Sequence, residues 1–132
     1  MASVIPIAFK KALFAGRAWR AALYVSAANL GNATAGYSAA NEVVGAGYVA
    51  GGKPLVALII DGSDGLTALL DFDDLNWPAS SFVARYILVY DNNAAGKEGF
   101  VIDMGQDQQI SGGIFAIEWP LPDLLTAIMA AA

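Results

Sequence analysis

Cysteine and histidine are both absent from this chain of 132 residues. Without cysteine, the chain cannot form a disulfide, a thiolate nucleophile or a cysteine-ligated zinc site. Without histidine, it lacks the usual general base and the commonest metal ligand, so Ser-His-Asp and Cys-His catalysis are excluded. We therefore expect a protein that is not an enzyme and that carries no cofactor.

Charged residues are also scarce, at 14% of the chain against about 25% in a typical soluble domain. Hydrophobic residues reach 57%, and the mean hydropathy is +0.52. So few charges cannot keep the surface of an isolated monomer free of apolar patches. We therefore expect a homo-oligomer or a lattice-bound protein, with more than roughly 1,000 Å² of surface buried against neighbours.

Long apolar runs are missing as well. The best candidates, 55–60 and 124–132, fall far short of the ~18–20 residues that a membrane-spanning helix needs. The net charge of −5 and the pI of about 4.3 disfavour nucleic acid as a partner, because its phosphates repel an acidic surface. Neither a membrane nor a nucleic acid is expected as a partner.

Acidic residues gather between positions 61 and 74 and offer hard oxygen ligands of the kind that Ca²⁺ prefers. They are Asp61, Asp64, Asp71, Asp73 and Asp74. Their spacing is not that of an EF-hand, so we favour turn and solvated-strand roles over a metal site. Together with Glu118 they could also form a glycosidase pair, but no carboxylate separation can be derived from one sequence.

The segment 41–52 holds four of the fourteen glycines and separates a basic, alanine-rich part from an acidic part rich in β-branched and aromatic residues. Glycine is the default where φ must be positive, so we predict a corner that leads into a β-sheet. Gly47 and Gly52-Lys53 also have the spacing of a phosphate-binding loop. Pro54 stands where that motif needs a hydroxyl, and a β run follows in place of a helix, so we favour the turn.

Short β-favouring runs separated by glycine, asparagine and aspartate dominate the chain after position 54. They cover 55–61, 65–72, 81–91, 98–103, 113–119 and 124–129, and a weaker run lies at 22–27. Connections of three to six residues are too short for parallel crossovers. We therefore predict an all-β fold, an antiparallel sandwich or jelly-roll-like barrel of about six to eight strands with little helix. An extended N-terminal arm at 1–20 would precede a single domain at 21–132.

The run 82–90 is apolar on both faces apart from Arg85, which predicts a central strand and a carboxylate or carbonyl partner for that guanidinium. Large aromatic residues could form a ligand platform, but they more often fill a core or anchor an interface. They are Trp19, Trp77, Trp119, Tyr48, Tyr86 and Tyr90.

Five stretches between roughly residues 20 and 120 follow a recognisable order: Asn-Glu-Val-x-Gly-x-Gly-Tyr-x-Ala-Gly-Gly at 41–52, Asp-Asp-Leu-Asn-Trp at 73–77, Ala-Arg-Tyr at 84–86, Asp103 with its following glycine, and 111–119. In these stretches, of which 41–52 is the most specific, the chain resembles a family of small virion structural proteins of tailed bacteriophages. The resemblance implies a head decoration or cement protein that binds the major capsid protein or other virion subunits. It would sit on the phage head surface, and in the host cytoplasm during assembly. A tail or fibre module that contacts a host surface is the alternative.

The charge is divided unevenly along the chain. Residues 1–41 hold four cations and no acid, a net +4, whereas residues 42–132 hold three cations and twelve acids, a net −9. This predicts that the N-terminal segment lies on an acidic neighbouring subunit, with apolar residues supplying most of the affinity. The interface candidates are Val4, Ile5, Ile7, Phe9, Lys10, Lys11, Arg17 and Arg20. The alternative is that the four cations form only a solvated rim.

Overall fold

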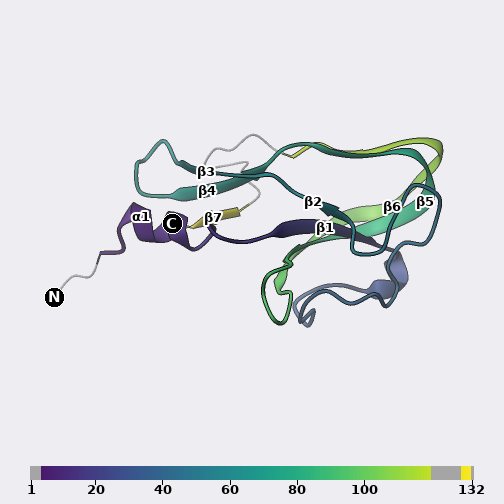
Figure 1. Ribbon diagram of the computed structural model, residues 1–132, viewed down its shortest axis with the longest axis horizontal. Helices are drawn as coiled ribbons and strands as arrows, with labels where there is room; N and C mark the ends of the chain where they lie inside the picture. The colour runs from purple at the N-terminus through teal and green to yellow at the C-terminus, as the bar shows by residue number, and fades with distance from the viewer. Residues whose placement is uncertain (1–3, 120–128, 132) are drawn as a thin grey trace. The chain divides into compact units, whose positions relative to one another are not determined.

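The computed structural model describes residues 4–119 and 129–131, and its strands pair in antiparallel fashion throughout (Figure 1). The elements are α1 (Ile7–Ala12), β1 (Trp19–Tyr24), the 3-10 turn η1 (Ser26–Ala28), β2 (Lys53–Pro54), β3 (Ala57–Asp61), β4 (Ala68–Phe72), β5 (Leu75–Asp91), β6 (Gly99–Ile117) and β7 (Met129–Ala131). The all-β prediction is confirmed. Within the described residues, neither sheet closes into a barrel. The chain forms two compact units, and each is described by itself below.

Unit 2 comprises residues 18–55 and 75–117 and contains the sheet β2-β1-β5-β6. Its main feature is the hairpin of β5 and β6, whose strands include 75–80 and 104–112, which the sequence analysis places between its β runs. In 104–112 the separation was wrong because the glycines there occupy irregularities of the strand and do not end it. The register between the strands shifts three times, and Gly105 and Gly112 have φ of 84° and 62°.

Arg85 lies on β5 beside one of these register shifts and binds Asp103 of β6, as the sequence predicts. Its Nε donates to Oδ1 at 2.7 Å and its Nη2 to Oδ2 at 3.3 Å. The hydrogen bond from Arg85 lowers the pKa of the Asp103 carboxyl. Asp103 Oδ1 also accepts from the Gly105 amide at 2.8 Å, so one carboxylate fixes both the guanidinium and the bulged backbone.

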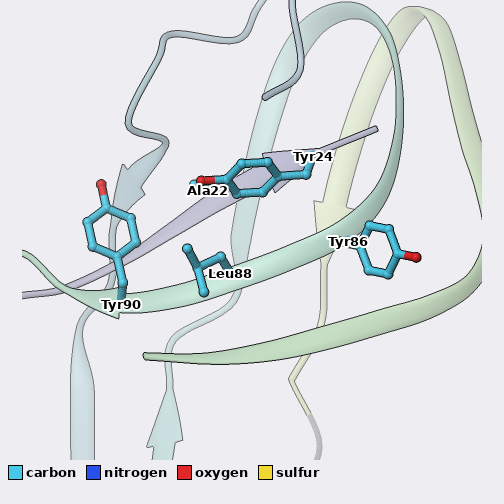
Figure 2. Packing of buried hydrophobic residues seen from close by; sticks show 5 residues of the cluster. All are labelled: Ala22, Tyr24, Tyr86, Leu88 and Tyr90. Atoms are coloured by element: carbon cyan, nitrogen blue, oxygen red, sulfur yellow. The ribbon is translucent and has the colours of Figure 1, made fainter. Parts of the chain in front are cut away.

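The core of unit 2 lies on β5, which pairs with β1 on one side and β6 on the other, so the predicted central strand is confirmed. Figure 2 shows Leu88 between Tyr86 and Tyr90 along this strand, with Ala22 and Tyr24 of β1 beside them. Trp19 and Trp77 are also buried, and the Trp77 ring meets Phe115 edge-on. The aromatic residues of this unit therefore fill a core, as the favoured interpretation expects.

A buried carboxylate anchors the glycine corner at 41–52. Glu42 Oε1 accepts from the Tyr37 hydroxyl at 2.7 Å, and Oε2 accepts from the Tyr48 hydroxyl and from the Gly51 amide, the latter at 2.8 Å. The Gly51 carbonyl in turn accepts from the Tyr90 hydroxyl at 2.7 Å. Gly47, Gly51 and Gly52 all have positive φ, and β2 follows directly, so the segment is the predicted corner and no helix follows it.

Unit 1 comprises residues 1–17, 56–74 and 118–132, and its described part contains α1 and the sheet β3-β4-β7. Ile7–Ala12 is helical, so the extended arm predicted for this segment is wrong. Pro6 keeps its extended conformation at the N-cap, outside the helix, so it does not prevent the helix that follows. Phe14 is buried just after the helix and ties it to the unit. The unit boundary at Arg17/Ala18 also differs from the arm boundary expected at 20/21. The predicted strand at 124–129 lies outside the described residues, apart from its last residue in β7.

Gly52 offers a test of the corner. A Cβ there would lie 1.8 Å from the Ala21 carbonyl oxygen, whereas a Cβ at Gly105 in the same unit would meet nothing within 4 Å. Both have positive φ, so both alanine variants carry a strain of roughly 1–2 kcal/mol. We expect Gly52→Ala to lower the free energy of unfolding by at least ~2 kcal/mol more than Gly105→Ala in urea titrations. Equal losses would contradict the close packing of corner and β1.

The buried tyrosines predict an alkaline limit to stability. Burial raises the pKa of Tyr24 to about 12 from its ordinary 10.0 and also raises the pKa of Tyr37, Tyr48 and Tyr90. The folded state therefore holds these protons more tightly than the unfolded state does. This stabilisation is complete below pH 10 and is lost as the pH rises from 10 towards 12. Urea titrations should show the decline together with tyrosinate absorbance, and Tyr24→Phe should reduce its slope. An unfolding free energy that is constant over this range would contradict the prediction.

Candidate interaction surface

Unit 1 carries most of the exposed large apolar side chains. Ten such residues are exposed in the described part of the chain, and only Val44, Val49 and Ile114 belong to unit 2. The seven in unit 1 are Val4, Ile5, Phe9, Leu13, Val56, Leu58 and Leu66. Exposed large apolar side chains that adjoin one another mark a surface covered by a partner more often than a free one, so the neighbours within this set are the place to look.

The helix α1 presents part of this surface. Phe9 lies in the helix and Leu13 is its C-cap residue, four positions later, so the two lie on one side of the helix. Ile5 comes before the helix, next to the extended N-cap residue Pro6. The exposed fractions of Phe9, Leu13 and Ile5 are 59%, 47% and 58%. We call these three residues the α1 stripe. Phe14 follows the helix and is buried, with 6% exposed. An ordinary surface helix hides its apolar stripe, whereas α1 keeps one exposed.

The lysines of α1 bind their own unit. Lys10 Nζ donates to the Leu66 carbonyl at 2.7 Å, and Lys11 Nζ lies 2.9 Å from an Asp61 carboxylate oxygen at the end of β3. A six-residue helix is marginal in water by itself, so these contacts and the burial of Phe14 hold it in place.

The arginines among the predicted contacts lie elsewhere. Arg17 Nε donates to the Leu13 carbonyl at 2.8 Å, after the helix. Arg20 belongs to unit 2, where its Nη2 donates to the Gly52 carbonyl at 2.8 Å. All four cations thus have partners within the chain. Of the apolar interface candidates, Val4, Ile5 and Phe9 are exposed and so could contact a neighbouring subunit, whereas Ile7 is half-buried. Contact with an acidic neighbour stays a prediction.

Asp64 and Asp74, two of the acidic residues at 61–74, accept hydrogen bonds within unit 1. Asp64 Oδ1 accepts from the amides of Leu66 and Thr67 at 2.8 and 2.9 Å, and its Oδ2 accepts from the Thr67 hydroxyl. The hydroxyl bond is the main reason why the pKa of this carboxyl is lowered. Asp74 accepts from the Trp119 amide at 3.1 Å. No three metal-ligating side chains gather in 4–119 and 129–131, and the absence of a metal site stays a prediction.

A hollow of about 480 Å³ opens in unit 2 beside Tyr24 and Tyr37. Its lining consists mainly of alanine, glycine, serine and asparagine and includes no charged residue. The Tyr24 hydroxyl donates to the Ser38 carbonyl at 2.6 Å, and its raised pKa keeps it protonated at neutral pH. The residues that line the hollow therefore include no carboxylate or amine that could act as a base towards the hydroxyls of Thr34 and Ser38.

No family model matches the chain, and neither a curated protein nor a solved structure shows similarity to it. Among the residues that the structure describes, no helix has both the length and the apolar character to cross a membrane. The apolar surface of unit 1 is therefore the candidate site. The sequence analysis missed Leu13, Val56, Leu58 and Leu66, although the spacing of Ile5, Phe9 and Leu13 by four residues was a usable signal for the first of them.

Phe9 and Phe14 form a matched pair for testing this surface. Phe14→Ala should lower the free energy of unfolding of unit 1 by about 3 kcal/mol or more, because it removes a buried ring beside α1. Phe9→Ala should change it by no more than ~0.5 kcal/mol, because that ring is largely exposed. Thermal and urea unfolding measure both. A large loss for Phe9→Ala would mean that this ring supports the fold of the free chain.

Proposed function

We propose that this protein is a non-enzymatic structural subunit that attaches to neighbouring subunits of a protein assembly through the α1 stripe. The supporting observation is that Phe9 of α1 is exposed, as are Ile5 before the helix and its C-cap residue Leu13, while Lys10 and Lys11 bind their own unit. An apolar stripe without flanking free lysines suits a dry, permanent contact better than a transient one.

Apolar burial supplies most of the affinity in this proposal. Covering a large apolar side chain completely contributes roughly 1.5–3 kcal/mol, so the three partly exposed residues of the stripe together contribute on the order of 3–6 kcal/mol. Exposed ion pairs contribute only ~0–1 kcal/mol each. The attachment should therefore survive high salt, with charges serving orientation.

The assembly we propose is a phage head, with the protein as a decoration or cement subunit on the major capsid protein. The basis for this choice is the resemblance of 41–52 and the later stretches to small virion proteins. A tail or fibre module that binds a host surface is less well supported. A platform of exposed aromatic rings would suit such a module, whereas Trp19 and Trp77, two of the aromatic candidates, are buried.

Loading onto particles tests the attachment. Particles that lack the protein are mixed with the wild type, with Phe9→Ser/Leu13→Ser, or with the matched control Val44→Ser/Val49→Ser, whose two valines are exposed in unit 2. We expect full occupancy for the wild type and the control, at low and at high salt. Occupancy of the stripe variant should fall at least tenfold, as a loss of ~1.4 kcal/mol or more requires.

Two results would contradict the proposal. Full loading of a folded stripe variant would remove α1 as the contact. Absence of the wild-type protein from purified particles, measured by mass spectrometry, would remove the phage head as the assembly.

A further inference from the structure

The two sheets have four edges, and three of them carry features that block further strand pairing. β2 has two residues, one of them Pro54, and β7 has only three. β6 is long, but Asp103, Asp107 and the bulges near Gly105 and Gly112 interrupt it. Charges, prolines, bulges and short length are the usual means of preventing edge-to-edge association.

The fourth edge, β3, has none of these features in its interior. Its sequence is Ala57, Leu58, Ile59, Ile60 and Asp61, with no proline and no lysine. The one charge lies at its last residue and is paired with Lys11. Leu58 is 53% exposed, and β3 pairs only with β4 among the described strands. An apolar edge of this kind is a template for another strand.

The hydrogen bonds at the two ends of β3 define which residues face its open edge. The Asp73 amide donates to the Val56 carbonyl at 3.1 Å, and the Gly62 amide donates to the Thr67 carbonyl at 2.7 Å. Hydrogen-bonded pairs alternate along an antiparallel ladder, so even-numbered residues of β3 direct their backbone groups towards β4. The odd-numbered ones, Ala57, Ile59 and Asp61, direct theirs to the open edge.

We propose that this edge pairs with β3 of a second copy of the chain, antiparallel and centred on Ile59. In that register Ala57 lies opposite Asp61 and Leu58 opposite Ile60, so apolar residues meet and no like charges are opposed. The two Asp61 side chains lie at opposite ends, about 14 Å apart along the strand. A parallel, in-register pair would place them side by side. The self-pairing supplies about six backbone hydrogen bonds.

This self-complementarity is the reason for choosing a second copy of the chain as the partner of β3. In a two-fold symmetric contact the same strand occurs twice, so its charged residues must not oppose each other. The pairing joins two three-stranded sheets into one and covers Leu58. It goes beyond the attachment proposed above, since it concerns two free copies of the chain and needs no particle. The two ideas can therefore fail separately.

Sedimentation velocity over a range of concentrations, with amide hydrogen exchange, tests the pairing on the wild-type chain. We expect a monomer–dimer equilibrium in which the amides of Ala57, Ile59 and Asp61 exchange at least tenfold more slowly in the dimer. The amides of Leu58 and Ile60 already bond to β4, so their protection should change far less.

Two variants at one position separate backbone pairing from apolar adhesion. Ile59→Pro removes an amide that faces the open edge and leaves the bonds to β4, so it should abolish the dimer. Ile59→Thr keeps the amide and the β-branch and should retain it. Phe9→Ser/Leu13→Ser should retain it too, because α1 takes no part.

A wild type that stays monomeric at every concentration overturns the proposal. So does a dimer in which Ile59 exchange is unchanged, or a folded Ile59→Pro variant that associates like the wild type. If Ile59→Pro fails to fold, the alternating exchange pattern of the wild type decides the matter.

Discussion

The hydrogen bonding of the buried Glu42 carboxylate is the constraint on which unit 2 depends. A buried carboxylate is costly unless donors surround it, and here two tyrosine hydroxyls and the Gly51 amide do so. The same groups connect the corner to the sheet, because the Tyr48 hydroxyl also accepts from the Leu23 amide of β1 and the Gly51 carbonyl accepts from Tyr90 of β5. Glycine at 51 and 52 lets the backbone approach these partners with positive φ.

The central strand was predictable because its signal is local. A run that is apolar on both faces apart from Arg85 identifies a central strand without knowledge of its neighbours. The lengths of β5 and β6 were not predictable from the sequence. Glycines such as Gly105 and Gly112 occur both in turns and in β-bulges, and only the pairing with the partner strand distinguishes the two. Helix α1 was missed for a related reason. Six residues carry little periodicity, and the burial of Phe14 that holds the helix is a tertiary event.

The candidate surface was predictable only in part. Val4, Ile5 and Phe9 could be chosen from composition, because an apolar segment at a basic end of the chain is conspicuous. The partners of the lysines could not be predicted from composition, because Lys10 binds the carbonyl of Leu66, which lies 56 residues further along the chain. That contact changes the role of the charge. The lysines bind the helix to its own unit, and the stripe beside them stays exposed.

The two units thus differ in what they leave unsatisfied. In unit 2, the carboxylates of Glu42 and Asp103 have donors, and the exposed edges are short or interrupted. Unit 1 leaves two separate surfaces open, and they rely on different physics. The α1 stripe gains from removal of apolar area from water, which weakens on cooling, whereas the edge of β3 gains from directional backbone hydrogen bonds that fix a register. A subunit that needs both a non-directional attachment and a symmetric, register-specific contact requires two such surfaces, because neither kind of interaction can supply the other's property.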